Sequence, residues 1–368
     1  MKPKSKRPIA IVLGTRPEII KLSALIRLCE RKRVPYFLLH TGQHYSFEMD
    51  RVFFKELRLP VPKYRLSVHQ SPAIGHGHHV GRMMEELESI LLKERPHTVV
   101  VQGDTNTVLA GTLVASKIDG MAVAHVEAGL RSYDRQMPEE INRVLCDHAS
   151  DLLFPPTPAA KHTLLKEGIE AGKIFVTGNT IVDAVQQNLK IAAKRPLVKG
   201  AKKPFFLLTM HRQENVDDKK RLVFILEGLR LVHEKLKTPI YFPAHPRTVN
   251  KLKAFNVKLP KGIHVHAPAG FLDFLRLEAE AEMALTDSGG VQEETCILKV
   301  PCVTLRTTTE RPETVTVGGN VIVGYEPQAI LRGALKMIGK KPTWKNPFGD
   351  GHASERILST IQRKANGR

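Results

Sequence analysis

Residues 285–319 read LTDSGGVQEETCILKVPCVTLRTTTERPETVTVGG, and this stretch indicates the fold most directly. A short apolar run reaches Thr286 and is followed by the small residues Ser288, Gly289 and Gly290, after which acidic residues open a helical pattern. The order predicts a strand, a glycine turn and a helix. Paired glycines let the backbone approach a ligand closely, and the N–H groups of a helix start favour phosphate. The stretch therefore predicts an anion-binding turn.

A polar loop follows the next strand of the same stretch. The strand is expected over residues 300–305, and the loop over residues 306–313 contains Arg306 and Arg311 among three threonines. Guanidinium groups bind phosphate oxygens with two parallel hydrogen bonds, so the loop is suited to a diphosphate. An ordinary strand–helix–strand connection with a solvated loop would also explain these residues. The pairing of a glycine turn with a basic loop favours the diphosphate site.

Length and composition indicate a globular enzyme. The 368 residues are 42% hydrophobic, which is enough for the cores of two domains of ordinary size. The formal net charge of +19 attracts polyanions, but the basic residues are scattered in short groups and aromatic residues make up only 6% of the chain. The composition favours a small anionic substrate and predicts no nucleic-acid partner.

Neither a membrane segment nor a cysteine framework is expected. No apolar run has the length that a bilayer requires, and Gly14 and Arg16 interrupt the first apolar segment before it could act as a signal peptide. We therefore expect a cytoplasmic protein without a membrane partner. The four cysteines form no CxxC pair, so no zinc ribbon or disulfide scaffold is expected; they are Cys29, Cys146, Cys296 and Cys302.

The first half of the chain repeats the pattern of strand, polar loop and helix. A strand over residues 9–13 ends at a glycine turn that carries Arg16, and a strand over residues 36–40 leads to Gln43 and His44. In open α/β sheets, ligands bind beyond the carboxyl ends of the strands. Arg16, Gln43 and His44 are therefore candidates for one site.

Three histidines lie close together in the stretch GHGHH, at His76, His78 and His79. A zinc site is conceivable, but no cysteine or carboxylate follows at the customary spacing, and the two adjacent side chains point in different directions. A glycine loop over residues 75–79, ahead of a helix over residues 80–94, is the favoured interpretation. We expect no metal site.

Carboxylates follow two consecutive strands and a proline. Asp104 comes after the strand at residues 98–101, where helix capping is the ordinary role of an aspartate. Glu127 ends an apolar strand, where an unpartnered carboxylate is costly unless it has a function. Glu139 and Glu140 follow Pro138 at a helix start, and their charge could simply complement the helix dipole.

The lysine-, proline- and glycine-rich stretch at residues 195–204 is expected to separate two domains. Strands over residues 152–154 and 174–176 are expected before it. After it, strands over residues 205–210 and 240–242 deliver basic loops that contain His211, Arg212 and His245. We expect an N-terminal domain, a C-terminal domain and a last helix that packs back on the first domain, over residues 1–194, 204–352 and 353–368.

Nine motifs in order carry a family resemblance. They are GTRPEIIK, TGQH, QGDTNT, HVEAGLR, PEEINR, TGNTIVD, MHRQEN, TDSGGVQEE and TTERPE. With these blocks the chain resembles the non-hydrolysing UDP-N-acetylglucosamine 2-epimerases over about residues 9–324. The resemblance implies an α/β fold of two Rossmann-like domains that face each other across a cleft, which is the GT-B architecture of many nucleotide-sugar glycosyltransferases. It also implies a homodimer and an isomerase of polysaccharide biosynthesis.

The resemblance implies a specific reaction. The family interconverts UDP-GlcNAc and UDP-ManNAc without NAD or metal, so no cofactor is expected. UDP is eliminated across C1 and C2 to give 2-acetamidoglucal, and it adds back after a proton returns to the other face of C2. The route needs carboxylates that move the proton, cations that stabilise departing UDP, and a closed site that retains both fragments.

The resemblance also assigns roles to residues. By similarity, the catalytic residues are Asp104, Glu127, Glu139 and His211, with no assignment of acid and base. The substrate-binding residues are Arg16, Lys21, Phe274, Ser288, Gly289, Gly290, Glu294 and Arg311. Glu294 would hold the ribose hydroxyls, and Phe274 would lie beside uracil or, alternatively, belong to the core. Bacterial relatives bind a second UDP-GlcNAc, for which Gln43, Arg212 and His245 are candidates.

Alternative functions stay open on the sequence alone. The substrate could be a modified UDP-sugar such as a diacetamido uronic acid nucleotide, and a GT-B glycosyltransferase would need the same nucleotide site. A hydrolysing epimerase would release UDP, and a non-catalytic binder would show no turnover. Three separated carboxylate motifs in the first half favour an epimerase, because a transferase needs at most one general base there.

Overall fold

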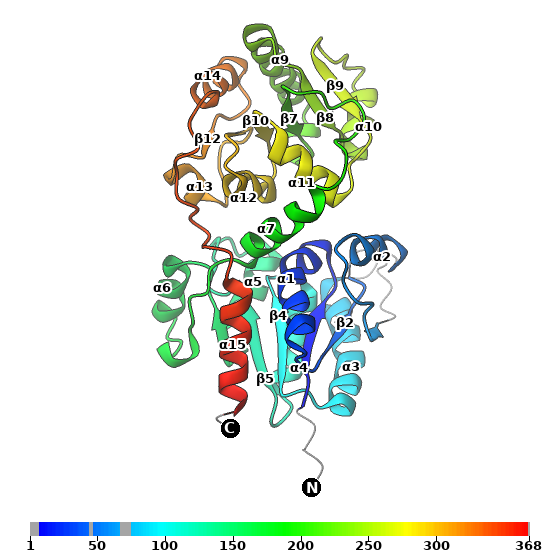
Figure 1. Cartoon of the computed structure of the whole chain (residues 1–368), viewed down its shortest axis with the longest axis vertical. Helices are drawn as coiled ribbons and strands as arrows, with labels where there is room; N and C mark the ends of the chain where they lie inside the picture. The colour runs from blue at the N-terminus through cyan, green and yellow to red at the C-terminus, as the bar shows by residue number, and fades with distance from the viewer. Residues whose placement is uncertain (1–6, 44–46, 67–74, 367–368) are drawn as a thin grey trace. The chain divides into compact units, whose positions relative to one another are not determined.

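The computed structural model in Figure 1 describes residues 7–43, 47–66 and 75–366. The chain folds into two compact units, each of which is described below by itself. Unit 1 comprises residues 1–186 and 348–368, and unit 2 comprises residues 187–347. His44, a candidate binding residue, lies outside the described residues.

Unit 1 contains a six-stranded parallel sheet with the order β3-β2-β1-β4-β5-β6. This is the strand order of the Rossmann fold. Strands β1 to β3 are added toward one edge of the sheet and β4 to β6 toward the other, so the switch point lies between β1 and β4. Its central strands are runs of aliphatic residues that are buried on both faces, as parallel sheets require. The strands are β1 (Ile9–Leu13), β2 (Tyr36–His40), β3 (Tyr64–Arg65), β4 (Thr98–Gln102), β5 (Ala122–Val126) and β6 (Leu152–Phe154).

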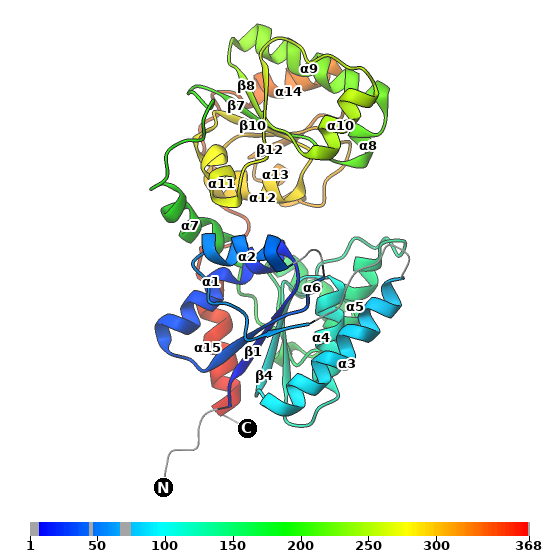
Figure 2. The same ribbon diagram turned by 90° about the vertical axis from the view of Figure 1, so that its right-hand side faces the viewer.

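Helices cover both faces of this sheet. Figure 2 shows α1 and α15 on one side of β1 and β4, with α3, α4 and α5 on the other. The apolar side chains of α3 and α4 pack with those of the central strands in one core. The helices of unit 1 are α1 (Arg16–Lys32), α2 (Phe47–Glu56), α3 (His76–Glu94), α4 (Asn106–Ser116), α5 (Pro138–Ala149), α6 (Pro158–Lys166), η1 (Ala171–Lys173), α7 (Thr180–Ala192), which the division into units cuts, and α15 (Ala353–Asn366).

Unit 2 repeats the same topology. Its six parallel strands have the order β12-β11-β10-β7-β8-β9. Read from β9 to β12, this order matches that of unit 1, with β7 in the place of β1 and β10 in the place of β4. The prediction of two α/β halves is therefore confirmed. The strands are β7 (Phe206–Thr209), β8 (Ile240–Pro243), β9 (Ile263–His266), β10 (Met283–Thr286), β11 (Cys302–Thr304) and β12 (Asn320–Ile322).

The sheet of unit 2 also lies between two helix layers. In Figure 2, α9 and α14 lie on one side of β7, β8 and β10, and α11, α12 and α13 lie on the other. Apolar residues of α9 and α14 share a core with the central strands. The helices are α8 (Gln213–Val216), α9 (Lys219–Leu236), α10 (Pro246–Ala254), α11 (Phe271–Glu280), α12 (Gly289–Leu298), α13 (Pro312–Thr316) and α14 (Pro327–Met337).

The division between the units differs from the expected boundary at residues 195–204. It falls inside α7, after Gln186. The stretch beyond residue 194 packs on unit 2, because Arg195 pairs with Asp273 at 3.0 Å and Leu197 packs against the cluster around Phe205. The lysine and proline content of residues 195–204 therefore does not indicate a linker without contacts to either unit. The last helix, α15, packs against α1 of unit 1.

Two local expectations were wrong. The histidine stretch is not a glycine loop: Gly75 is the N-cap of α3, and the amide of His79 already donates to its carbonyl at 3.3 Å. The strand expected over residues 174–176 is reduced to a single bridge between Ile174 and Leu153. Its neighbour β6 ends before two consecutive prolines, which have no N–H group to continue a ladder.

Candidate active site

The turn between β1 and α1 is packed tightly against neighbouring loops of unit 1. A Cβ at Gly14 would overlap the hydroxyls of Thr41 and Thr107, so glycine is required there. Those two hydroxyls are themselves hydrogen bonded at 2.7 Å. The buried Gln43 accepts two hydrogen bonds through Oε1, from the amide and the hydroxyl of Thr107, each at 2.7 Å. Gln43 thus joins the loop after β2 to the first turn of α4, and its place in a second nucleotide-sugar site stays a prediction.

A buried carboxylate that the sequence interpretation missed supports the same turn. Glu18 accepts hydrogen bonds from the amides of Gly14 at 2.5 Å and Thr15 at 3.0 Å, and from the hydroxyl of Thr105 at 2.5 Å. Burial raises the pKa of Glu18 to about 7, against the opposing effect of these hydrogen bonds. Glu18 lies three residues after Thr15 at the start of a helix, which is the spacing of a capping box. This spacing could have identified Glu18 from the sequence.

Glu127 lies at the carboxyl end of β5 in an unusual conformation. Its φ of 69° is in the left-handed region, which costs a non-glycine residue about 1–3 kcal/mol and persists where the surroundings enforce it. Lys21 of α1 places its Nζ 2.7 and 2.6 Å from the two carboxylate oxygens, and Gln102 donates to Oε2 at 2.6 Å. The structure therefore brings Lys21, which was expected near the diphosphate, into direct contact with a catalytic candidate.

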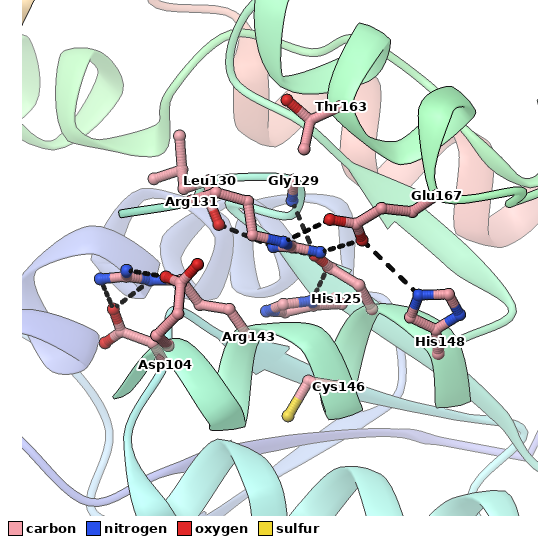
Figure 3. A network of polar contacts seen from close by, with 12 residues as sticks. Asp104, His125, Gly129, Leu130, Arg131, Arg143, Cys146, His148, Thr163 and Glu167 are labelled. Carbon is pink, nitrogen blue, oxygen red and sulfur yellow. Dashed lines mark hydrogen bonds and ion pairs between the residues drawn. The ribbon is translucent and has the colours of Figure 1, made fainter. Parts of the chain in front are cut away.

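Asp104 follows β4 and is held by an arginine (Figure 3). Arg143 of α5 donates to Asp104 Oδ2 from Nε at 2.9 Å and from Nη2 at 2.6 Å. The Asp104 side chain remains 32% exposed, so the carboxylate is oriented and still open to a ligand. Sequence interpretation missed Arg143, although its position three residues after Glu140 on the same predicted helix was a usable signal.

The two adjacent glutamates at the start of α5 have different surroundings. Glu140 is buried and accepts hydrogen bonds from the amides of Ser132 and Tyr133, each at 2.9 Å, and from Arg143 at 2.7 Å. Burial alone would raise the pKa of Glu140, but these hydrogen bonds hold it below its ordinary value. Glu139 is partly exposed and forms no hydrogen bond or ion pair within the described residues. Of these two glutamates, Glu139 is therefore the candidate for contact with a ligand.

In unit 2, an aspartate organises two loops at the carboxyl ends of β7 and β10. Asp287 is fully buried, and its carboxylate accepts from the amide of His211 at 3.0 Å, the amide of Arg212 at 2.9 Å and the side chain of Asn215 at 3.2 Å. Carboxylates that accept backbone N–H groups in this way fix loop geometry. Asp287 thus holds His211 and Arg212 beside the glycine turn.

The ring of His211 is partly buried and lies next to Asp287. Its Nδ1 lies 3.6 Å from Asp287, and its ring centre lies 6.0 Å from that of His245. Burial lowers the pKa of His211, with Arg212 and His245 acting in the same direction against Asp287. A neutral imidazole can donate one hydrogen bond through one ring nitrogen and accept one through the other. The structure thus places two second-site candidates, Arg212 and His245, next to His211.

The glycine turn opens α12 as expected. Ser288 is the N-cap, and the helix begins at Gly289. A Cβ at Gly289 or Gly290 would meet no atom nearer than 3.7 Å, and neither residue has a positive φ. The protein itself therefore does not require glycine at these two positions. A ligand that approaches the first-turn N–H groups of α12 would require it.

The two arginines of the neighbouring loop have separate partners. Arg306 pairs with Glu214 at 2.8 Å and with Glu310 at 2.7 Å, and its side chain is 8% exposed. Burial alone would raise the pKa of Glu310, but its contacts with Arg306 hold it at about 2. Arg311 pairs with Glu293 of α12 at 2.7 Å and is more exposed. Arg306 therefore stabilises the loop, while Arg311 remains the better candidate for phosphate.

Glu294 has a carboxyl partner that the sequence interpretation missed. Glu278 on α11 is fully buried, and Glu294 on α12 is near enough for its charge to act on the Glu278 carboxyl group. Burial and the charge of Glu294 raise the pKa of Glu278 well above its ordinary value. Both effects favour the neutral acid form of Glu278 over its carboxylate.

The remaining candidates are placed in the unit to which they belong. Arg16 begins α1 and lies over the ring of Phe53, with 4.9 Å between Cζ and the ring centre. Phe274 is partly buried beside the cluster around Phe205 and Tyr241, so it contributes to the core and keeps one exposed part. In the described part of the chain, no group of three or more histidine, cysteine or acidic residues is arranged to hold a metal ion. Among the described residues, no helix has the length and apolar character that crossing a bilayer requires.

Comparisons with known proteins place this site in a family. The sequence model of the family described as UDP-N-acetylglucosamine 2-epimerase matches residues 27–362. The chain belongs to this family. The UDP-N-acetylglucosamine 2-epimerase of Methanocaldococcus jannaschii is 56% identical over 96% of this chain and 98% of its own. The resemblance drawn from the nine sequence motifs is therefore confirmed.

Solved structures and a second relative extend the comparison. A crystal structure of the M. jannaschii UDP-GlcNAc 2-epimerase in complex with UDP-GlcNAc and UDP has a TM-score of 0.84 to this chain at 55% identity, covering 97% of this chain and 99% of the other. The UDP-2,3-diacetamido-2,3-dideoxy-D-glucuronate 2-epimerase of Pseudomonas aeruginosa is 41% identical over 96% of this chain and 99% of its own. Acinetobacter baumannii MurG, at 11% identity and a TM-score of 0.58 over 97% and 99% of the two chains, shares the fold alone.

Proposed function

We propose that this protein is a non-hydrolysing UDP-N-acetylglucosamine 2-epimerase, an isomerase that interconverts UDP-GlcNAc and UDP-ManNAc. The observation that carries the proposal is the set of three carboxylates in unit 1, on Asp104, Glu127 and Glu139, which follow the carboxyl ends of two adjacent strands and open the next helix. The names of relatives at 56% and 51% identity support the substrate. The reaction conserves electrons overall, so it needs no redox cofactor.

Unit 2 would supply the nucleotide site. The first turn of α12, at Gly289 and Gly290, offers backbone N–H groups to the diphosphate, and Arg311 adds a cation that Glu293 orients. Glu294, in its charged form, would accept hydrogen bonds from the two ribose hydroxyls, and Phe274 would lie beside uracil. His211 would donate a hydrogen bond near the departing diphosphate oxygen.

Unit 1 would supply the groups that move the C2 proton. In the elimination, the C2–H and C1–O bonds break, a C1=C2 double bond forms, and UDP leaves with the bonding electrons of the C1–O bond. A carboxylate accepts the proton, and a carboxylic acid returns one to the opposite face before UDP adds back. Glu139 is open to such exchange, while Lys21 and Arg143 orient Glu127 and Asp104. The acid and the base remain unassigned among the three.

Proton NMR of UDP-GlcNAc with the purified protein in D2O tests the proposal. We expect UDP-ManNAc with deuterium at C2 and little free UDP, with Glu127→Gln as the inactive control. Free UDP as the main product would indicate a hydrolysing epimerase instead. An unchanged and undeuterated nucleotide sugar would contradict the proposal and bring forward a glycosyltransferase or a binding protein.

A modified UDP-sugar is the second candidate substrate. The 41% identity to the P. aeruginosa diacetamido-glucuronate nucleotide epimerase over nearly the whole chain favours it over unrelated sugars. The same NMR experiment with that nucleotide decides between the two, because the true substrate would incorporate deuterium faster at equal concentration. Equal rates would contradict a preference for plain UDP-GlcNAc.

We further propose a cytoplasmic homodimer with a UDP-sugar as its ligand and without a nucleic-acid or membrane partner. The family resemblance supports the dimer. Light scattering after size-exclusion chromatography measures the mass directly, and a monomer of 41.1 kDa would contradict it. Binding of a second UDP-GlcNAc at Gln43, Arg212 and His245 is a separate proposal, which a sigmoidal dependence of rate on UDP-GlcNAc concentration would support.

A further inference from the structure

A histidine buried beneath the loops of unit 1 is bonded at both ring nitrogens. His125 lies on β5 and is 1% exposed. Its Nδ1 lies 2.7 Å from Asp147 Oδ1, and its Nε2 lies 2.8 Å from the carbonyl oxygen of Gly103. A backbone carbonyl can only accept a hydrogen bond, and so can an ionised carboxylate. Both ring nitrogens must therefore donate, which describes a doubly protonated imidazolium.

The charge of this imidazolium is balanced within a buried network. Asp147, on α5, also accepts from Arg131 Nη1 at 2.7 Å and from the amide of Gly129 at 3.0 Å. Arg131 in turn donates to Glu167 from Nε at 2.8 Å and Nη2 at 2.6 Å. Two cations thus face two carboxylates, an arrangement that compensates for burial of the charges.

The groups around His125 act on its pKa in opposite directions. Burial alone lowers the pKa of His125, but Asp147, the Gly103 carbonyl and the more distant Asp104 together raise it above its ordinary value. Arg131 and Glu167 lie beyond Asp147, and Cys146 is the neighbour of Asp147 on α5. At the outer end, His148 contacts Glu167 at 3.5 Å.

The network joins the segments that carry the catalytic candidates. Gly103 immediately precedes Asp104, and His125 lies two residues before Glu127. Asp147 lies one helical turn after Arg143, which orients Asp104. A change in the distance between β5, α5 and the loop after β4 would therefore move Asp104 relative to Glu127.

We propose that His125 is a positioning residue for the epimerisation, acting as a buried imidazolium whose two donated hydrogen bonds hold Asp104 and Glu127 in the geometry that proton transfer needs. This inference rests on the proposed function of those two carboxylates. Loss of one ring proton would leave a nitrogen lone pair against an oxygen lone pair and loosen one of the two contacts. Because the folded-state pKa is raised, the imidazolium persists to higher pH than that of an ordinary histidine and is lost as pH rises through the folded-state pKa.

The test uses Asp147→Asn in the full-length protein. This change removes the charge that sustains the imidazolium and keeps the size of the side chain. We expect the alkaline limb of kcat against pH to move to lower pH by about one unit, and kcat at pH 8 to fall roughly tenfold, with KM nearly constant. NMR of 15N-labelled histidine would show a matching fall in the pKa of His125.

Asp151→Asn is the matched control. Asp151 caps the opposite end of β5 by accepting from the amide of Val123 at 2.9 Å, outside the network. We expect it to lower the melting temperature and leave the pH profile in place. If Asp147→Asn does not fold, Glu167→Gln removes a charge one step further out and should shift the limb in the same direction by less.

Two results would overturn the inference. One is a neutral His125 at pH 7 in the wild type. The other is a pH profile that Asp147→Asn leaves unmoved, with activity lost only in proportion to melting temperature, as for Asp151→Asn. A wild type that is inactive toward UDP-GlcNAc would instead refute the proposed function, while the NMR titration would still decide the charge of His125.

Discussion

The two units place an aspartate at the same point of the same topology and use it in different ways. Asp104 follows β4 of unit 1, and Asp287 follows β10, which is the corresponding strand of unit 2. The side chain of Asp104 is 32% exposed and is oriented by Arg143. Asp287 is fully buried and accepts hydrogen bonds from the amides of two residues in the adjacent loop. The same strand end thus presents a partly exposed carboxylate in one unit and, in the other, a buried one that holds a loop.

The difference arises from which carboxylate accepts hydrogen bonds from the amides of the loop after the first strand of each sheet. In unit 1, the loop after β1 is held by Glu18, from within its own helix. In unit 2, Glu214 has the same position after β7 but accepts a hydrogen bond from Arg306, and Asp287 accepts from the loop amides instead. Because Glu18 already satisfies the amides in unit 1, Asp104 is left available for a ligand.

The largest effect is expected from Asp287→Ala. Removing this carboxylate leaves two loop amides and the Asn215 side chain without their acceptor, so the free energy of unfolding should fall by about 4 kcal/mol. Urea denaturation followed by circular dichroism measures this loss. A stable but inactive variant would show that Asp287 resembles Asp104 in function, and the contrast between the units would fail.

Asp104→Asn should have the opposite profile. We expect kcat to fall roughly a hundredfold, with the free energy of unfolding and UDP affinity nearly unchanged, because the amide keeps the shape and cannot accept a proton. Glu127→Gln and Glu139→Gln should act similarly, and Glu140→Gln should mainly lower stability. Steady-state kinetics with calorimetric UDP binding checks this. Full turnover in all three catalytic variants would contradict the carboxylate assignment.

Gly289→Ala tests the ligand role of the turn in unit 2. Since a Cβ there has room and the backbone is helical, we expect an unchanged melting temperature and roughly tenfold weaker UDP binding. Gly14→Ala is the contrasting variant, because its Cβ would overlap two threonine hydroxyls and should destabilise unit 1. Unaltered UDP affinity in Gly289→Ala would place the diphosphate elsewhere.

The smallest effects concern the two fully buried glutamates, Glu18 and Glu278. Both have raised pKa values, so each contributes stability that is present below the ordinary value of 4.5 and is lost as pH rises, for Glu18 through about pH 7. Glu278→Gln removes this loss, and its stability relative to wild type should increase from pH 5 to pH 8. Glu18→Gln should destabilise at every pH, because it weakens hydrogen bonds from two amides. Thermal unfolding across that pH range measures both, and a Glu278→Gln variant whose stability relative to wild type does not rise with pH would contradict the raised pKa of Glu278.

The sequence determined the local elements and their order. Alternation of aliphatic runs with polar loops predicted two α/β halves, and the glycine turn before α12 was found where Gly289 and Gly290 were expected. Short-range patterns of this kind depend on backbone conformation and on which face of an element is apolar, so they can be interpreted without knowledge of distant residues. They failed where a distant partner decided the outcome, as in the stretch at residues 195–204, which packs on unit 2.

Only the tertiary structure decided which charged side chains are buried and with whom they pair. Glu139 and Glu140 are neighbours at a helix start, yet one is a buried loop clamp and the other is open to a ligand. Lys21 contacts Glu127, which is 106 positions away in the sequence, and the two ring nitrogens of His125 contact Asp147 and Gly103. Coulomb energies and desolvation depend on distance and burial in the folded chain, and neither quantity is written in the local order of residues.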